Sequence, residues 1–204
     1  MHSHRLGSTV VTTASIVVLV SGSGTLLQAI LDAQGESYRV THVIADKECP
    51  ALERARRAGV GTSVVALEGD RGQWDEQLAR SVEKQTPDVV VSAGFMRILG
   101  PAFLKAFEGR TINTHPALLP SFPGAHGVRD ALNYGVKVTG STVHYVDAGV
   151  DSGAIIAQEP VRIDRNDDEG SLHEKIKRVE RRLIVEVLRS ADIDTTTGKV
   201  NFSV

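Results

Sequence analysis

The residues best suited to catalysis are Asn113 and His115, which lie two positions apart where a short apolar run ends. A side-chain amide can donate a hydrogen bond to a developing oxyanion, and an imidazole beside it can act as an acid or a base. The alternative is that this Asn-x-His pair only makes the hydrogen bonds of a turn. The pair therefore indicates either an oxyanion donor beside an acid or base, or a turn without a catalytic role.

Asp151 is the carboxylate that could complete such a site. It follows Asp147 in a turn that also contains two glycines, Gly149 and Gly153. A carboxylate beside His115 would favour the charged form of the imidazole. Alternatively, both aspartates hydrogen-bond only to the backbone of their own turn. The spacing leaves both interpretations open.

A glycine-rich turn, Ser-Gly-Ser-Gly-Thr at residues 21–25, follows the first apolar run. The backbone N–H groups and helix dipole of such a strand-to-helix turn can hold a phosphate. The turn lacks the third glycine of the dinucleotide-binding fingerprint. It therefore indicates either a phosphate site or a tight turn without a ligand.

The last amphipathic segment, residues 171–189, carries an acidic residue on its apolar stripe. An inward carboxylate is costly unless it has a partner, and Lys177 lies three residues before Glu180. Either the two residues form a simple helix pair, or Glu180 binds a ligand amine while Lys177 faces a phosphate. At about 100° per residue, Glu180 lies within the arc of Leu172, Ile176, Val179, Leu183 and Val187.

The candidate residues belong to an alternation of valine- and isoleucine-rich runs with amphipathic segments, which predicts an α/β domain with a mainly parallel sheet. Ligands of such sheets bind at the carboxyl ends of the strands, where these candidates lie. Two extended stretches without a helix between them, 138–146 and 154–163, predict an antiparallel addition. The other expected strands are 16–20, 39–46, 62–66, 88–94 and 110–114. One expected helix follows the turn at 21–25 and ends at about 33, and the others span 51–58, 74–85 and 101–107.

The composition narrows the class of protein. With 204 residues, 41% of them hydrophobic, the chain can bury one sizeable core. Its 23 basic and 25 acidic side chains give no surplus charge for a nucleic acid or an anionic membrane. The single cysteine, Cys49, favours a reducing cytoplasmic compartment, and no metal-ligand spacing is present. We expect a flexible leader at 1–14, one domain at 15–190 and a short C-terminal tail at 191–204.

Together these segments, from about residue 16 to residue 189, resemble the glycinamide ribonucleotide formyltransferase family. Four stretches in the family's order carry the resemblance, namely 88–99, 113–120, 140–146 and 151–153. The resemblance implies a Rossmann-like, mostly parallel sheet of seven strands with helices on both faces. It also implies transfer of a formyl group from 10-formyltetrahydrofolate to glycinamide ribonucleotide in purine synthesis, without a metal.

The same resemblance assigns roles to the candidates. Asn113 and a protonated His115 would stabilise the oxyanion, while Asp151 would keep His115 charged. His115 would also help to route a proton to the departing folate nitrogen. The ribonucleotide phosphate would bind at Gly24, Thr25 and Leu26, with Lys177 and Glu180 nearby, and the folate would lie against Met96, Arg97, Ile98, Leu99 and Asn113, with Arg71 reaching toward its tail.

Leu26 departs from the asparagine that the family often has, so only its backbone N–H could serve. Two relatives share the catalytic residues, a formyltransferase acting on initiator tRNA and a hydrolase that deformylates the folate. Each carries a further domain for which this chain has no room, and the near-neutral charge also argues against tRNA. A catalytically silent nucleotide-binding module is another alternative. Whether the chain pairs as a homodimer is left open.

Overall fold

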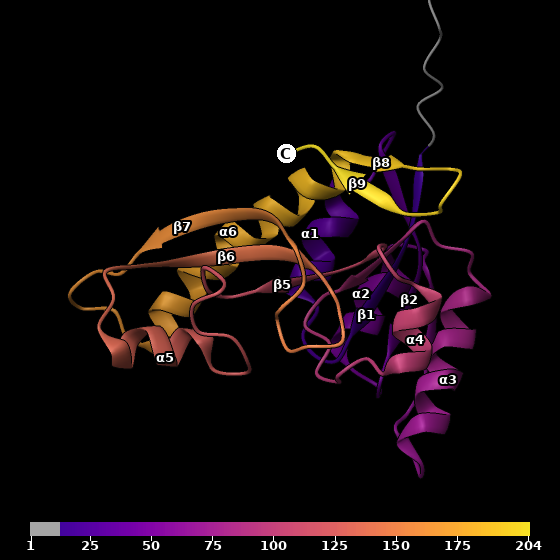
Figure 1. Cartoon of the computed structure of the whole chain (residues 1–204), viewed down its shortest axis with the longest axis horizontal. Helices are drawn as coiled ribbons and strands as arrows, with labels where there is room; N and C mark the ends of the chain where they lie inside the picture. Colours follow the sequence, from indigo (N-terminus) through magenta and orange to yellow (C-terminus); the bar gives the residue numbers. More distant parts are fainter. Residues whose placement is uncertain (1–12) are drawn as a thin grey trace, which may run out of the picture.

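The computed structural model describes residues 13–204, and within them the largest feature is a seven-stranded sheet (Figure 1). Its strands are β1 (Ala14–Val20), β2 (Tyr38–Ala45), β3 (Gly61–Val64), β4 (Val89–Ser92), β5 (Thr111–His115), β6 (Val138–Tyr145) and β7 (Ile155–Arg162). They lie in the order β3-β2-β1-β4-β5-β6-β7. The first five pair in parallel, and β6 and β7 are added antiparallel. The mostly parallel seven-stranded sheet is thus confirmed.

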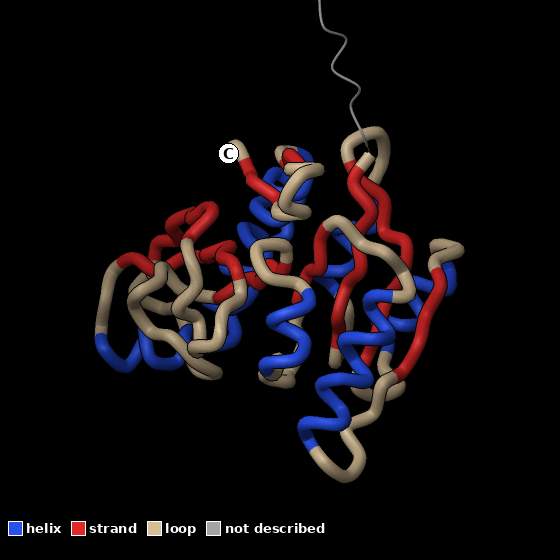
Figure 2. Tube along the Cα trace, turned by 45° about the vertical axis from the view of Figure 1, so that its right-hand side comes forward, coloured by secondary structure: helices blue, strands red, loops and turns tan. Residues whose placement is uncertain are grey.

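Helices cover both faces of this sheet (Figure 2). Buried side chains of α1, α2 and α6 pack on one face, and those of α3 and α4 pack on the other. The short α5 packs against α6 and β7 in a smaller hydrophobic cluster. The helices are α1 (Thr25–Ala33), α2 (Pro50–Arg57), α3 (Arg71–Glu83), α4 (Pro101–Ala106), α5 (Gly127–Tyr134) and α6 (Glu169–Arg189).

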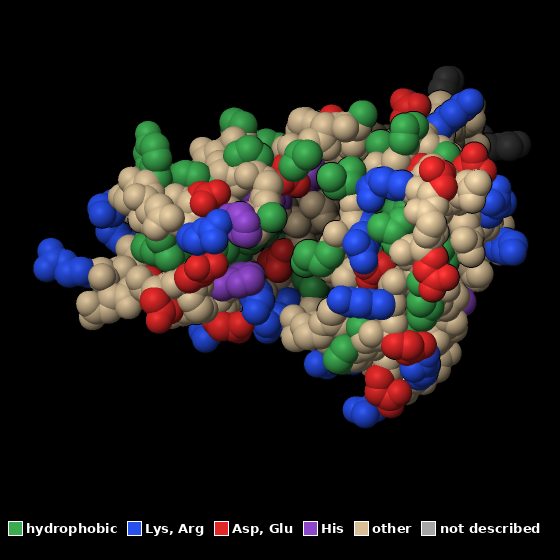
Figure 3. Space-filling model, turned by 90° about the horizontal axis from the view of Figure 1, so that it is seen from below, with side chains coloured by type: hydrophobic (Ala, Val, Ile, Leu, Met, Phe, Trp, Pro, Cys, Tyr) green, Lys and Arg blue, Asp and Glu red, His purple; other side chains and the backbone are tan. Residues whose placement is uncertain are grey.

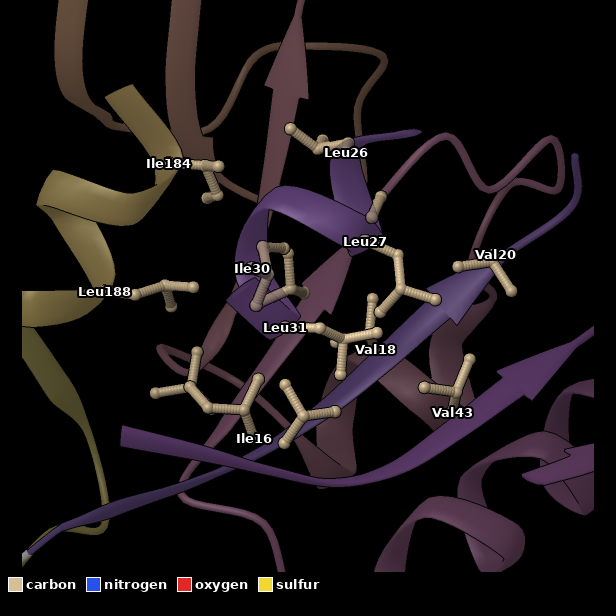
Figure 4. Packing of buried hydrophobic residues seen from close by; sticks show 14 of the residues in the cluster. Ile16, Val18, Val20, Leu26, Leu27, Ile30, Leu31, Val43, Ile184 and Leu188 are labelled. Carbon is tan, nitrogen blue, oxygen red and sulfur yellow. The ribbon is translucent and has the colours of Figure 1, made fainter. Parts of the chain in front are cut away.

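The valine- and isoleucine-rich run of β1 is buried on both faces, because neighbouring side chains point to opposite sides of the sheet. Ile16, Val18 and Val20 pack with α1 and α6, as Figure 4 shows. Val17 and Leu19 pack on the other face, with α3 and α4. The strand β1 therefore packs against both helical layers.

Capping residues explain why two helices begin earlier than their hydrophobic pattern predicts. The side chain of Asp70 accepts a hydrogen bond from the backbone N–H of Gln73, so α3 begins at Arg71. Asp168 and Ser171 form a capping box, so α6 begins at Glu169. Arg71 consequently stands at the first position of a helix.

Three features differ from the expected elements. The sequence did not predict α5, because the helix begins at a glycine in a proline- and glycine-rich stretch. The residues expected as a C-terminal tail begin with β8 (Ala191–Ile193), which pairs with β9 (Val200–Phe202) and buries Val200. The expected leader lies mostly outside the described residues, and Ala14, its last position, begins β1.

Within residues 13–204, no helix has the length and apolar character needed to cross a membrane. The carboxyl ends of β1, β4 and β5 lie side by side, because these strands are parallel neighbours. Three of the stretches singled out in the sequence therefore meet at one edge of the sheet. These are the turn at 21–25, the loop at 94–99 and the end of β5.

Candidate active site

The last residues of β5 and the facing residues of β6 position the polar side chains of the site. Asn113 and His115 project from the same face of β5, and Asn113 is the partner of His144 in the register with β6. The amide nitrogen of Asn113 lies 3.3 Å from Nε2 of His144. The side chain of His115 is buried. Two strands thus carry one amide and two imidazoles into a shared space.

Asp151 brings a carboxylate to these histidines from the turn between β6 and β7. Its Oδ2 lies 3.3 Å from Nδ1 of His115, and its Oδ1 lies 3.6 Å from Nε2 of His144. The backbone N–H of Gly124 also donates to Oδ2, at 2.7 Å. Asp151 has a φ of 52°, in the left-handed region that aspartate adopts more readily than most residues. The structure therefore brings Asn113, His115 and Asp151 together around His144.

Both ring nitrogens of His115 face acceptor oxygens. Nε2 lies 2.7 Å from the carbonyl oxygen of Phe122, and Nδ1 faces the carboxylate of Asp151. Both partners can only accept a hydrogen bond, whereas a neutral imidazole has one N–H. His115 therefore lies between a carbonyl oxygen and a carboxylate.

Asp151 is ionised at neutral pH. Its pKa is lowered to about 2, chiefly by the hydrogen bond with His144. The N–H of Gly124 and the charge of His115 lower this pKa further, while burial acts in the opposite direction. A permanently negative carboxylate therefore stands between two imidazoles.

His144 is the residue of this group that the sequence did not single out. It lies inside a run that reads as an ordinary strand, and its place becomes visible only from the register of β6 against β5. Its Nδ1 donates to the carbonyl of Tyr145 at 2.8 Å, which leaves Nε2 facing both Asn113 and Asp151. In the sequence, the only indication of this role is that His144 lies within the stretch 140–146.

The glycine-rich turn presents backbone groups at the start of α1. Gly24 is the N-cap residue and has a φ of 71°, which places it in the left-handed region. Leu26 is buried against the core, so only its backbone can face a ligand at this helix end. The first N–H groups of α1, from Thr25 onward, have no partner within the helix and can bind an anion.

The helix pair of Lys177 with Glu180, one of the two alternatives, is not formed. Lys177 instead donates to Glu174 at 2.8 Å. Glu180 is turned inward from α6, and burial raises the pKa of its carboxyl. A hydrogen bond from Thr114 and the positive charges of Arg181 and Lys177 counteract part of this rise. Because Thr114 lies between Asn113 and His115 in β5, Glu180 stands on the opposite face of that strand.

Hydrogen bonds of three residues hold the loop after β4 in place. The N–H of Met96 donates to the hydroxyl of Ser21 at 2.9 Å, and Nε of Arg97 donates to Asp46 at 2.7 Å. Arg71 hydrogen-bonds to the carbonyl of Ile98 and stacks over Trp74.

The side chains of this loop differ in exposure. Met96 and Ile98 are 76% and 66% exposed, whereas Leu99 is 7% exposed and packs in the core. The exposed side chains of Met96 and Ile98 can therefore contact a ligand, while hydrogen bonds hold the backbone of the loop in place. Figure 3 shows the surface hollowed between the part built from β6, β7 and α5 and the part with α3 and α4.

The chain is similar to several known proteins. Residues 14–188 match the formyl transferase family model. Phosphoribosylglycinamide formyltransferase of Mycobacterium tuberculosis (strain ATCC 25618 / H37Rv) is 57% identical over 176 residues, covering 84% of this chain and 82% of that protein. The Escherichia coli (strain K12) protein of the same name is 41% identical over 169 residues, covering 80% of each chain.

A solved structure is also similar. Glycinamide ribonucleotide transformylase 1 from Symbiobacterium toebii has a TM-score of 0.86 and 40% identity, covering 94% of this chain and 95% of that one. The family model extends over all seven strands of the main sheet and nearly all of α6. On this evidence the chain belongs to the formyl transferase family.

Proposed function

We propose that this enzyme transfers the formyl group of 10-formyltetrahydrofolate to the amine of 5'-phosphoribosylglycinamide. The products are N-formylglycinamide ribonucleotide and tetrahydrofolate, and the step belongs to de novo purine (IMP) synthesis. The close similarity to proteins named phosphoribosylglycinamide formyltransferase supports this reaction. The single observation that carries it is the carboxylate of Asp151 lying against His115 and His144, beside Asn113. The reaction takes place in the cytoplasm, whose reducing conditions suit a lone cysteine.

The chemistry is direct acyl transfer. The neutral amine of the ribonucleotide attacks the formyl carbon, a new C–N bond forms, and the carbonyl oxygen becomes an oxyanion. The amide of Asn113 and the imidazolium of His115 stabilise this negative charge. When the bond to the folate nitrogen breaks, that nitrogen gains a proton and the attacking nitrogen loses one. His115 helps to route this proton, so no net proton is consumed.

Asp151 and His144 act on the charge and position of these groups. The ionised carboxylate keeps His115 doubly protonated, since a buried imidazolium without a counter-charge would be costly. His144 occupies the second carboxylate oxygen and touches the amide of Asn113. The four side chains are thereby held in position before either substrate arrives.

The two substrates bind at the two loops beside this group. The ribonucleotide places its phosphate on the N–H groups of Gly24, Thr25 and Leu26. Lys177 faces this phosphate, and Glu180 faces the amine or sugar of the same substrate. The phosphate can draw Lys177 away from Glu174, because an exposed ion pair of this kind contributes little. The folate lies on the apolar side chains of Met96 and Ile98, with the backbone around Arg97 and Leu99 recognising its pterin and Arg71 near its tail.

A spectroscopic assay of 10-formyltetrahydrofolate consumption tests this function. Three acceptors are compared under the same conditions, namely glycinamide ribonucleotide, charged initiator tRNA and water. We expect turnover with the ribonucleotide alone. Turnover with tRNA would identify a tRNA formyltransferase, and turnover with water would identify a folate hydrolase.

A further inference from the structure

Two residues of α2 donate hydrogen bonds to the glycine-rich turn before α1. The backbone N–H of Ala51 donates to the carbonyl of Gly22 at 3.1 Å. One turn later in the helix, Nε of Arg54 donates to the carbonyl of Ser23 at 2.8 Å. The two carbonyl groups of the turn that point toward α2 are therefore both occupied by donors of that helix.

Arg54 also reaches the first turns of α1. Its NH1 group donates to the side-chain oxygen of Gln28 at 3.2 Å, and the backbone N–H of Gln28 donates to the carbonyl of Gly24 at 2.9 Å. One guanidinium thus joins the glycine-rich turn to the helix that follows it. A planar group with several N–H donors in fixed directions suits this bridging position.

The packing behind Gly24 leaves no space between the turn and α2. A Cβ atom at Gly24 would lie 2.6 Å from the Cβ of Ala51 and 3.3 Å from the Cδ of Arg54. The side chain of Arg54 therefore lies directly against the backbone of the turn.

The charge of Arg54 is not neutralised by an acidic partner. Among the ion pairs of residues 13–204, Arg56 pairs with Glu48 and Arg57 with Glu53, but none involves Arg54. Its positive charge therefore remains available to an anion on the other side of the turn.

The bond from Arg54 acts on the peptide group that would bind the anion. The carbonyl of Ser23 and the N–H of Gly24 belong to one peptide unit. A cation that binds the carbonyl polarises this unit, and hydrogen bonds in such a chain strengthen one another. The N–H of Gly24 becomes a stronger donor as a result.

We propose that Arg54 is a positioning residue for phosphate recognition, which holds the Ser23–Gly24 peptide with its N–H toward the phosphate of the ribonucleotide and strengthens that donor. The proposal rests on the proposed function, because it takes the phosphate to bind at this turn. It adds a residue that does not touch the ligand and lies outside the catalytic group.

The test compares Arg54→Gln with Arg57→Gln, a matched control at the last position of the same helix. Arg57 makes only an exposed pair with Glu53, which contributes little. For each variant, kcat/KM is measured with glycinamide ribonucleotide and with the same acceptor lacking its phosphate. Folate affinity and thermal unfolding are measured in parallel to show that both variants are folded.

We expect Arg54→Gln to lower kcat/KM for the ribonucleotide by about tenfold, the usual effect of losing a hydrogen bond to a charged group. The phosphate-free acceptor, folate affinity and the control variant should show no such change. An equal loss with both acceptors, or no loss with either, would overturn the proposal. A wild type that uses neither acceptor would instead refute the proposed function itself.

Discussion

Asp151 contacts two histidines, and the contact with His144 has the larger effect on its pKa. His144 also touches the amide of Asn113. It is therefore the residue through which the amide and the carboxylate are held in fixed relation. This contact depends on a side chain in β6 that only the strand register reveals.

Replacing His144 tests this role. In His144→Ala, Asp151 loses the contact that lowers its pKa most, so this pKa should rise from about 2 toward the ordinary value of 3.8. Turnover should fall roughly tenfold or more, because Asn113 and Asp151 lose their common support. A carbon NMR titration of the Asp151 carboxyl and steady-state kinetics measure the two effects.

The stability of the variant should show the same change. A lowered carboxyl pKa contributes stability that is present above the unfolded value and is lost as the pH falls through the folded value. In the wild type this loss extends down to about pH 2, and in His144→Ala it should be complete at a higher pH. A matched control is His42→Ala, since His42 contacts Ser63 away from the site. Unchanged titration of Asp151 in His144→Ala would contradict the assignment.

Among the elements, α6 combines a structural and a binding role. Leu172, Ile176 and Leu183 are buried as their spacing predicts, yet the same stripe carries Glu180. An inward carboxylate is a cost in the unliganded protein, since burial raises its pKa. Such a cost is common where stability is given up for binding.

Glu180→Gln should therefore stabilise the protein and weaken its binding of the ribonucleotide. A raised pKa gives stability that is fully present below the unfolded value and is lost as the pH rises through the folded value. The variant should gain stability over the wild type as the pH rises above about 4.5, the ordinary value for glutamate. Urea unfolding at several pH values measures this gain.

Glu186→Gln, at an exposed position of the same helix, is the control and should behave like the wild type. If Glu180→Gln were no more stable than the wild type at pH 8, burial would not disfavour the ionised form of Glu180. Tighter ribonucleotide binding by Glu180→Gln would argue against its contact with the amine or sugar.

The elements with strong periodicity could be predicted from the sequence. The run at 16–20 and the helix from 171 to 189 were recognised because their side chains are sorted by burial alone. The elements α5, β8 and β9 could not be predicted in this way. They are short, and they form by packing against parts of the fold that are distant in the sequence. The starts of α3 and α6 were missed by two or three residues, because caps set them rather than apolar spacing.

At the scale of the whole molecule, the site depends on contacts between distant parts of the chain. Asn113 and His115 could be proposed from their own spacing. Spacing left their contact with Asp151 open and only the family resemblance implied it, because a turn far along the chain supplies this carboxylate. The neighbourhood of β1, β4 and β5 follows from the sheet order. From spacing alone, Lys177 could form an ion pair with Glu180. In the structure it forms one with Glu174 instead.

The central claim is that the amide, imidazolium and carboxylate brought together by these contacts act on one formyl carbon. The most direct measurement is single-turnover formyl transfer by Asn113→Ala and His115→Ala, with folate affinity determined for each. We predict that each rate falls by roughly two orders of magnitude or more while folate still binds. Near wild-type rates in either variant would contradict the claim.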